Sequence, residues 1–417
     1  MASFSSDKLI WKILLMAALS LLLLIPLSLI RELIRERQGN ADETLREVSG
    51  NWGWEQTLSG PQVQLFRERT EQEKKEKDDD GLVSMSIYPD RLLYDVDTRT
   101  QNLHRAIYEI MVYTADITAS GSFLFPEQCR EYGVKTIFSL GLNDLRGIEG
   151  AVTLTVGGRE YSITEGGNGQ VSQQIELDPA CFGSGQAVPF EIRFRTRGSQ
   201  GLYFKPYGMV TEVHLRGDCP APSFDGEFLP SERDVRDDGF SASWTVSAIN
   251  RGRPEEKRFG VKLLQGVSQY QQTTRSAKYG LLVILLVFVA GLAVELVGKK
   301  SIHIIQYLVI GLSLVLFYAL LLSFSELMAF WLAYLLAAGM TTAALTGYFR
   351  GILRNRTAWL LGALVAIAYI VCYVLLQMET YALVAGTLVL FVILTGIMYF
   401  TRDLRPAAAA GPQEARD

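Results

Sequence analysis

Six long apolar stretches constrain this 417-residue chain more than any motif it contains. Each approaches the roughly 20 apolar residues that a helix needs to cross a hydrocarbon core about 30 Å thick. We expect transmembrane helices at residues 12–30, 279–297, 304–322, 327–348, 359–378 and 381–400. Glu295, near the end of its stretch, is the only ionised residue within the last five of them. The sequence therefore predicts a membrane protein with an α-helical transmembrane bundle of six helices, one plus five.

The distribution of Lys and Arg predicts the orientation, because short cytoplasmic loops retain these residues. Basic residues gather in alternate connections and in the tail, at Lys299, Lys300, Arg350, Arg354, Arg356, Arg402 and Arg405. These segments should be cytoplasmic, although Arg31, Arg35 and Arg37 argue the other way. We expect a cytoplasmic N-terminus at 1–11, a cytoplasmic tail at 401–417, and a large external domain at 31–278.

The first apolar stretch is best interpreted as an uncleaved signal anchor, because its core is long and no small-x-small cleavage pattern follows it. The segment Arg31–Arg37 contains good helix formers with opposite charges close along a turn, so the helix should continue beyond the membrane. A surface-lying amphipathic helix is the alternative.

The external domain should be β-rich. Alternation of apolar and polar residues predicts strands at 110–117, 151–156, 190–195, 211–215 and 241–246. Gly166-Gly167-Asn168-Gly169 predicts a hairpin turn between 161–163 and Val171. The domain carries 30 basic and 37 acidic residues, a net charge of −7, which argues against nucleic acid or anionic lipid headgroups as partners.

Chemistry-bearing motifs are scarce, which disfavours a conventional enzyme or a cofactor. The three histidines form no zinc pattern, and Glu212 with His214 should be two polar side chains on one solvated strand face. The run Glu71–Asp80 reads as a solvated loop rather than a cation site. Cys129 with Cys181 is our hypothesis for a disulfide, leaving Cys219 unpaired.

Polar residues in or beside the membrane are the better functional candidates, since charge is costly there unless it is paired or hydrated. They are Glu295, Gln306, Tyr307, Tyr318, Ser323 and Glu326. Structural explanations compete for two of them: Glu295 could pair with Lys299, and Ser323 with Glu326 fits a helix-capping box.

Several strings resemble, in order, those of the CreD family of inner membrane proteins of Gram-negative bacteria. The resemblance rests on Trp52-Gly53, Gln56–Pro61, Asp144–Ile148, Pro222–Pro230, Arg275 with Lys278-Tyr279, Gln306-Tyr307-Leu308 and Leu316–Glu326. The segments Val63–Phe66 and Asp218–Pro220 depart from the family's pattern. The resemblance implies an inner-membrane location, a periplasmic external domain and a role in cell-envelope integrity within a two-component envelope response, with no established reaction.

Two functions follow as hypotheses. In the first, the periplasmic domain binds or braces an envelope protein or glycan while the helices anchor it among membrane lipids. In the second, the five-helix bundle transports a substrate or handles lipid, with Glu295, Gln306, Tyr307 and Glu326 lining a path. Glycines along the apolar stretches could serve packing within one chain or between chains, so the oligomeric state stays open.

Overall fold

The chain divides into two compact units in its computed structural model. Met1–Ala41 and Val267–Asp417 form a helical unit, and Asp42–Gly266 form a β-rich unit. The structure describes residues 6–70, 73, 81–106, 108–163, 172–178, 187–263, 268–298, 302–353, 357–377, 384, 387, 388, 391 and 395.

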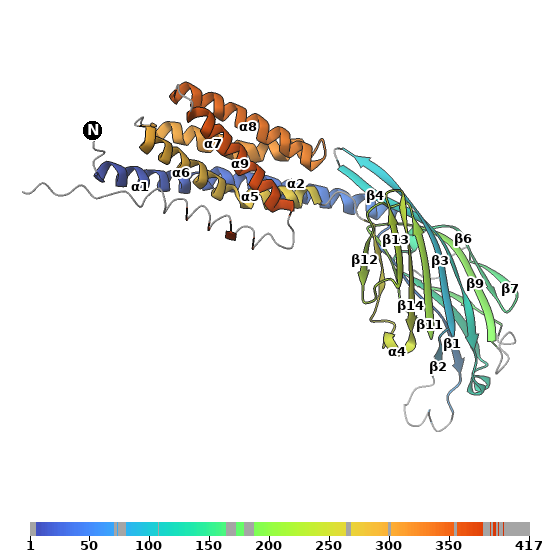
Figure 1. The fold of residues 1–417 in the computed structure, drawn as a ribbon. Helices are drawn as coiled ribbons and strands as arrows, with labels where there is room; N and C mark the ends of the chain where they lie inside the picture. The colour runs from blue at the N-terminus through green and yellow to red at the C-terminus, as the bar shows by residue number, and fades with distance from the viewer. Residues whose placement is uncertain are drawn as a thin grey trace, which may run out of the picture. The chain divides into compact units, whose positions relative to one another are not determined.

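The helical unit is a bundle of mostly apolar helices lying side by side (Figure 1). Its described helices are α1 (Ser6–Leu22), the first part of α2 (Leu24–Trp52), α5 (Ser268–Lys278), α6 (Gly280–Gly298), α7 (Ile304–Ser325), α8 (Phe330–Leu353) and α9 (Thr357–Gln377). Helix α8 packs against α7 and α9, and α1 packs against α6 and α7. Their buried faces share one apolar core that includes Leu27, Phe288 and Phe317.

Within the described residues, four helical segments are long and apolar enough to cross a membrane, and five if α5 and α6, bent by 41°, form one span. The expected helices at 12–30, 279–297, 304–322, 327–348 and 359–378 all correspond to observed helices, with shifted ends. The sixth, expected at 381–400, lies almost entirely outside the described residues. The predicted continuation of the first helix is confirmed, because α2 runs to Trp52.

The β-rich unit contains two sheets (Figure 1). The first has the order β12-β15-β10-β1-β5-β8, with β2 also paired to β1. Its strands are β1 (Gln56–Arg67), β2 (Val83–Ile87), β5 (Lys135–Leu142), β8 (Ser172–Glu176), β10 (Gly201–Phe204), β12 (Ser223–Gly226) and β15 (Phe259–Lys262). Most neighbours are antiparallel, but β1 and β10 are parallel.

The second sheet has the order β13-β14-β11-β3-β4-β9-β6-β7. Its strands are β3 (Arg91–Arg105), β4 (Tyr108–Leu124), β6 (Ile148–Val156), β7 (Arg159–Ile163), β9 (Ala187–Ser199), β11 (Val210–Gly217), β13 (Glu232–Arg236) and β14 (Gly239–Ser247). Short helices η1 (Glu127–Glu131), η2 (Leu145–Gly147) and α4 (Ala248–Arg251) lie between strands. All five predicted strands are present, within β4, β6, β9, β11 and β14.

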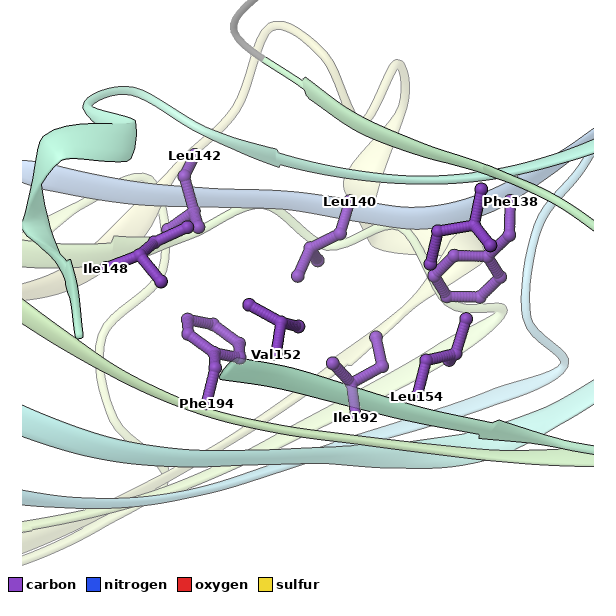
Figure 2. A pocket seen from close by; sticks show the side chains of 9 residues that line it. Phe138, Leu140, Leu142, Ile148, Val152, Leu154, Ile192 and Phe194 are labelled. Carbon is purple, nitrogen blue, oxygen red and sulfur yellow. The ribbon is translucent and has the colours of Figure 1, made fainter. Parts of the chain in front are cut away.

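The inward faces of the two sheets form one apolar core. Aromatic contacts cross it: Tyr94 of β3 lies 5.2 Å from Phe204 of β10, and Phe138 of β5 lies 6.2 Å from Phe190 of β9, between ring centroids. Figure 2 shows an apolar gap lined by side chains such as Leu140, Val152 and Phe194. Its volume is about 10 Å³, barely one water, so it is a packing defect and not a ligand site.

Two predictions about the β-rich unit are wrong. Strands β7 and β8, which flank Gly166–Gly169, pair in different sheets, so they do not form a hairpin with each other. Cys129 is a free thiol, so the expected disulfide to Cys181 is not formed, and Cys181 itself lies outside the described residues. Glycine-rich turns predict a reversal of the chain, but the partner of each strand depends on long-range packing.

Candidate functional site

One end of the helical bundle contains a buried ion pair. The carboxylate of Glu295 on α6 is 1% exposed and accepts a hydrogen bond from the ammonium of Lys12 on α1. Lys12 also donates to the carbonyl of Ile302 at 2.9 Å, and the Tyr307 hydroxyl lies 3.4 Å from Oε2 of Glu295. The expected partner, Lys299, lies outside the described residues. Lys12 is 283 residues from Glu295 along the chain, which no local pattern could reveal.

Gln306 has a structural role beside this pair. The side chain of His303 accepts from the amide of Ile305 at 3.3 Å, and Oε1 of Gln306 accepts from the amide of His303 at 2.9 Å. These reciprocal bonds form a capping box at the start of α7, where orphan amides need acceptors. Gln306 is therefore committed to the helix terminus.

The predicted capping box at Ser323 is wrong. Ser323 lies inside α7, which continues to Ser325, and its side chain is exposed. Glu326 is instead the C-terminal cap residue, 3.8 Å from Nε of Arg37 and 3.5 Å from the hydroxyl of Tyr270. A Ser-x-x-Glu pattern before apolar residues therefore did not mark a helix start here, because the preceding apolar run remained helical.

Tyr318 lies deep in the bundle, apart from both charged groups. Its ring packs against Phe317, and its buried hydroxyl has no hydrogen-bond partner among the described residues. Nearby, the Tyr334 hydroxyl donates to the carbonyl of Tyr369 at 2.8 Å. The six candidate residues thus fall into separate groups: Glu295 with Tyr307, the cap at Gln306, Tyr318, the exposed Ser323, and Glu326 near the opposite end of α7.

In the β-rich unit, Asp144 anchors the segment that follows α2. Its side chain is 8% exposed and accepts from the amide of Trp54 at 3.2 Å and from Arg146 at 2.9 and 3.1 Å. Gln56 donates to the carbonyls of Asp144 and Arg197, at 3.0 and 3.2 Å. These contacts join β1 of one sheet to β9 of the other, so we call Trp54, Gln56, Asp144 and Arg146 the latch.

Gly147, which lies beside the latch, leaves no room for a side chain. A Cβ on Gly147 would lie 2.3 Å from the carbonyl oxygen of Arg197 and 2.6 Å from Nε2 of Gln56. Trp52 donates from its indole to the carbonyl of Tyr113 at 3.3 Å, under the guanidinium of Arg197. The strings Trp52-Gly53 and Asp144–Ile148 are therefore structural in this chain.

The outward face of the second sheet carries charged residues that pair with one another. A groove of about 670 Å³ over β3, β11 and β14 contains Asp97 and Arg216, whose side chains bond at 2.8 Å. Hydrogen bonding to Arg216 lowers the pKa of Asp97. His214 on this face lies 3.0 Å from Ser243, as expected of a solvated strand face. No cluster of three or more His, Cys, Asp or Glu within the described ranges could hold a metal ion.

The outward face of the first sheet has a smaller, uncharged pocket. Its volume is about 240 Å³, and it is lined by Ser59, Gly60, Gln62, Gln64, Ser139, Gly141 and Tyr207. We call it the bulge pocket, because the pairing of β1 with β5 shifts between Ser59 and Gln62. The alternation of apolar and polar residues does not predict this pocket; the available signal is Gly60-Pro61 inside a strand, where glycine and proline often mark a bulge.

The ion pair at Glu295 can be tested through its effect on stability. Glu295→Gln or Lys12→Met leaves one buried polar partner without the other, which should reduce stability by about 3 to 5 kcal/mol. Lys12→Met combined with Glu295→Met should recover most of the loss. Thermal unfolding of the full chain in detergent measures this, with Lys278→Met, at an exposed site, as the control. A double variant no more stable than the single variants contradicts a purely structural pair.

The latch should make stability depend on pH. Burial acts to raise the pKa of Asp144, but bonds from Arg146 and from the Trp54 amide outweigh it and lower the pKa. At pH values above the pKa of Asp in the unfolded chain, about 3.9, the lowered pKa of Asp144 adds to the stability of the fold. This added stability is lost as the pH falls through the pKa of Asp144 in the folded protein. Asp144→Asn should cost about 1.5 to 3 kcal/mol at neutral pH, with the difference shrinking in acid.

The difference in stability between the wild-type chain and Asp144→Asn is measured at each pH by tryptophan fluorescence during unfolding of the full chain. Asp234→Asn is the matched control, because that carboxylate is 54% exposed and pairs with Arg236 at the surface. The control should cost less than about 1 kcal/mol. An Asp144→Asn penalty that stays constant down to acid pH contradicts the assignment.

Comparison with known proteins agrees with this architecture. The family model described as "Inner membrane protein CreD" matches residues 8–405. The chain is similar to the inner membrane protein CreD of Escherichia coli strain K12, with 29% identity over 95% of this chain and 93% of the relative. A solved M1 zinc metallopeptidase from Deinococcus radiodurans covers 42% of each chain at 9% identity, but its TM-score of 0.26 supports no argument. Because the family model matches almost the whole sequence, this chain belongs to the CreD family of inner membrane proteins.

Proposed function

We propose that the protein supports cell-envelope integrity by binding or bracing an envelope component through its β-rich unit, as a binding protein rather than an enzyme. The observation that carries this proposal is a contrast in how polar side chains are used. In the described helices, Glu295, Gln306 and Glu326 are engaged by Lys12, His303 and Arg37. In the bulge pocket, no described contact engages the side chains of Gln62 and Gln64. Polar side chains that line a pocket and make no other hydrogen bond are available to bind a ligand.

The proposal includes a topology of six membrane spans, with both termini in the cytoplasm and the β-rich unit in the periplasm. Its support is the positive charge in alternate short connections and the length of the apolar helices. A periplasmic position would place the faces of both sheets among envelope polymers and proteins.

This topology predicts which introduced cysteines a membrane-impermeant maleimide can reach. Ile249 is 94% exposed in the β-rich unit, so Ile249→Cys should react in intact spheroplasts. Ala2→Cys should react only after lysis, because the N-terminus is expected in the cytoplasm. Both variants are made in a chain whose four native cysteines are replaced. Labelling of Ala2→Cys, but not of Ile249→Cys, in spheroplasts would reverse the orientation.

A second candidate function is lipid handling by the helical unit. The observation that favours it is an apolar groove of about 480 Å³ between α2 and α7, lined by residues that include Pro26, Leu29, Val309, Leu312 and Leu316. Apolar grooves of this kind accept acyl chains. In a membrane protein, however, ordinary bilayer lipid also covers such a surface, so the groove by itself does not identify a transported molecule.

Photo-crosslinking in living cells separates the two functions. A photoreactive amino acid at Ile249 or Val235, both exposed on the β-rich unit, should capture an envelope protein or glycan identifiable by mass spectrometry. The same probe at Leu316, in the groove, should capture only bulk phospholipid. A single enriched lipid at Leu316, with no adduct from the β-rich unit, would favour lipid handling and would falsify the primary proposal.

A further inference from the structure

We propose that the bulge pocket binds one neutral pyranose unit of a saccharide. The inference rests on the proposed envelope-binding function and names a ligand class for it. It depends on how β1 and β5 shape the pocket, on the absence of charge in its lining, and on the hydrogen-bonding capacity that the lining leaves unused.

The floor of the pocket is produced by the bulge. Ser59 faces Gly141 and Gln62 faces Ser139 across the two strands, with two residues of β1 but one of β5 between these pairs. The extra residue brings Ser59 and Gln62 to the same outward face, because a bulge resets the alternation of side chains. Leu58 and Val63 meanwhile both remain buried in the core. The bulge thus gathers polar groups on one side without exposing apolar ones.

Gly141 keeps the floor open. A Cβ at this position would approach the Cβ of Ser59 to 3.1 Å, so a larger side chain would occupy the hollow or displace its neighbour. Position 141 also faces outward with Ser139, in register with Ser59. A bulky residue there would fill the space opposite β1.

One wall of the pocket is held rigidly. Arg251, which is 6% exposed, donates to the carbonyls of Pro206 and Tyr207 at 2.7 Å each. The Tyr207 ring also meets that of Tyr88 at 5.6 Å in an edge arrangement. Burial raises the pKa of Tyr207 to about 12, so its phenol is neutral at physiological pH. Tyr207 lines the pocket while its side chain packs into the apolar core, so this aromatic residue is fixed in place. An aromatic residue with a polar hydroxyl suits the mixed faces of a sugar ring.

The lining selects for neutral, hydroxyl-rich ligands. None of the described residues that line the pocket carries a charge, so a phosphate, carboxylate or ammonium entering it would lose water without gaining a counter-charge from them. Each glutamine amide has two donors and an acceptor, and serine hydroxyls both donate and accept. Neighbouring hydroxyls of a pyranose require this combination. The Ser139 hydroxyl makes one long contact, 3.5 Å to the Gln62 carbonyl, and no hydrogen bond engages the side chains of Ser59, Gln62 and Gln64 within the described chain.

The size limits the ligand to one sugar unit. Pockets that bury drug-sized molecules measure roughly 300 to 1,000 Å³, and the bulge pocket measures about 240 Å³. A single ring can enter, while the rest of an oligosaccharide would lie outside the pocket. Affinity should accordingly be modest and should improve when many units are presented on one strand.

The test uses the full chain in lipid nanodiscs. Soluble tri-N-acetylchitotriose and maltotriose are titrated by saturation-transfer NMR, and purified cell-wall sacculi are used in a sedimentation assay. Gln62→Ala with Gln64→Ala should weaken binding by about tenfold, through lost hydrogen bonds. Gly141→Val should weaken it similarly, by filling the floor. Gln101→Ala, an exposed glutamine of β3, is the matched control and should leave binding unchanged.

Each outcome has a defined meaning. Binding of both sacculi and chitotriose, lost in the pocket variants, supports a glycan-strand ligand, whereas binding of the soluble sugars alone supports a free saccharide. Failure of the wild-type chain to bind any neutral saccharide overturns the pocket's assignment, as does normal binding by both pocket variants. Neither failure affects the crosslinking result at Ile249 or Val235, so the proposed function can survive the loss of this inference. A melting curve for each variant shows that it is folded.

Discussion

A polar group that leaves water must find a partner, and this requirement shapes both units of the chain. In the helical unit, Glu295 is almost fully buried and pairs with Lys12. In the β-rich unit, Asp144 is satisfied by Arg146 and by the amide of Trp54. The buried guanidinium of Arg251 likewise donates hydrogen bonds to two backbone carbonyls, those of Pro206 and Tyr207. The Lys12, Trp54 and Arg251 contacts each join segments that are distant in the sequence, and their directional hydrogen bonds add specificity to the apolar packing.

The same requirement separates structural polar residues from those available to a ligand. The sequence marked Glu295, Gln306 and Glu326 because charge and amide groups are unusual beside a membrane. In the structure Glu295 pairs with Lys12, Gln306 belongs to a helix cap, and Glu326 forms an ion pair with Arg37. The bulge pocket shows the opposite condition. The side chains of Gln62, Gln64 and Ser59 line it, and no described hydrogen bond involves them. Rarity in sequence indicated where polar groups are costly, but only geometry showed which are free.

Sequence patterns predicted what depends on neighbouring residues. The alternation of Phe190–Arg195 is reproduced in β9, and the apolar stretch at 304–322 appears as α7. Patterns failed where distant segments decide the result. The glycine-rich run at 166–169 suggested a hairpin, yet its flanking strands join different sheets. Ser323 lies within α7 although its sequence resembles a cap. The Lys12 partner of Glu295 and the pairing shift at Ser59 depend on contacts that no local period encodes.

The strings that carry the family resemblance have different physical roles once they are placed in the fold. Trp52-Gly53 and Asp144–Ile148 form the latch and its surroundings, where the Cβ of any residue replacing Gly147 would collide with backbone. Gln56–Pro61 contributes to the latch through Gln56 and then turns into the bulge that opens the pocket. Gln64 lies just beyond, in the segment Val63–Phe66 that departs from the family's pattern. The shape of the bulge pocket therefore comes from Gln56–Pro61, whereas Gln64 comes from the next segment of β1. A substitution at Gln64 can thus change the side chains that contact a ligand without removing the bulge.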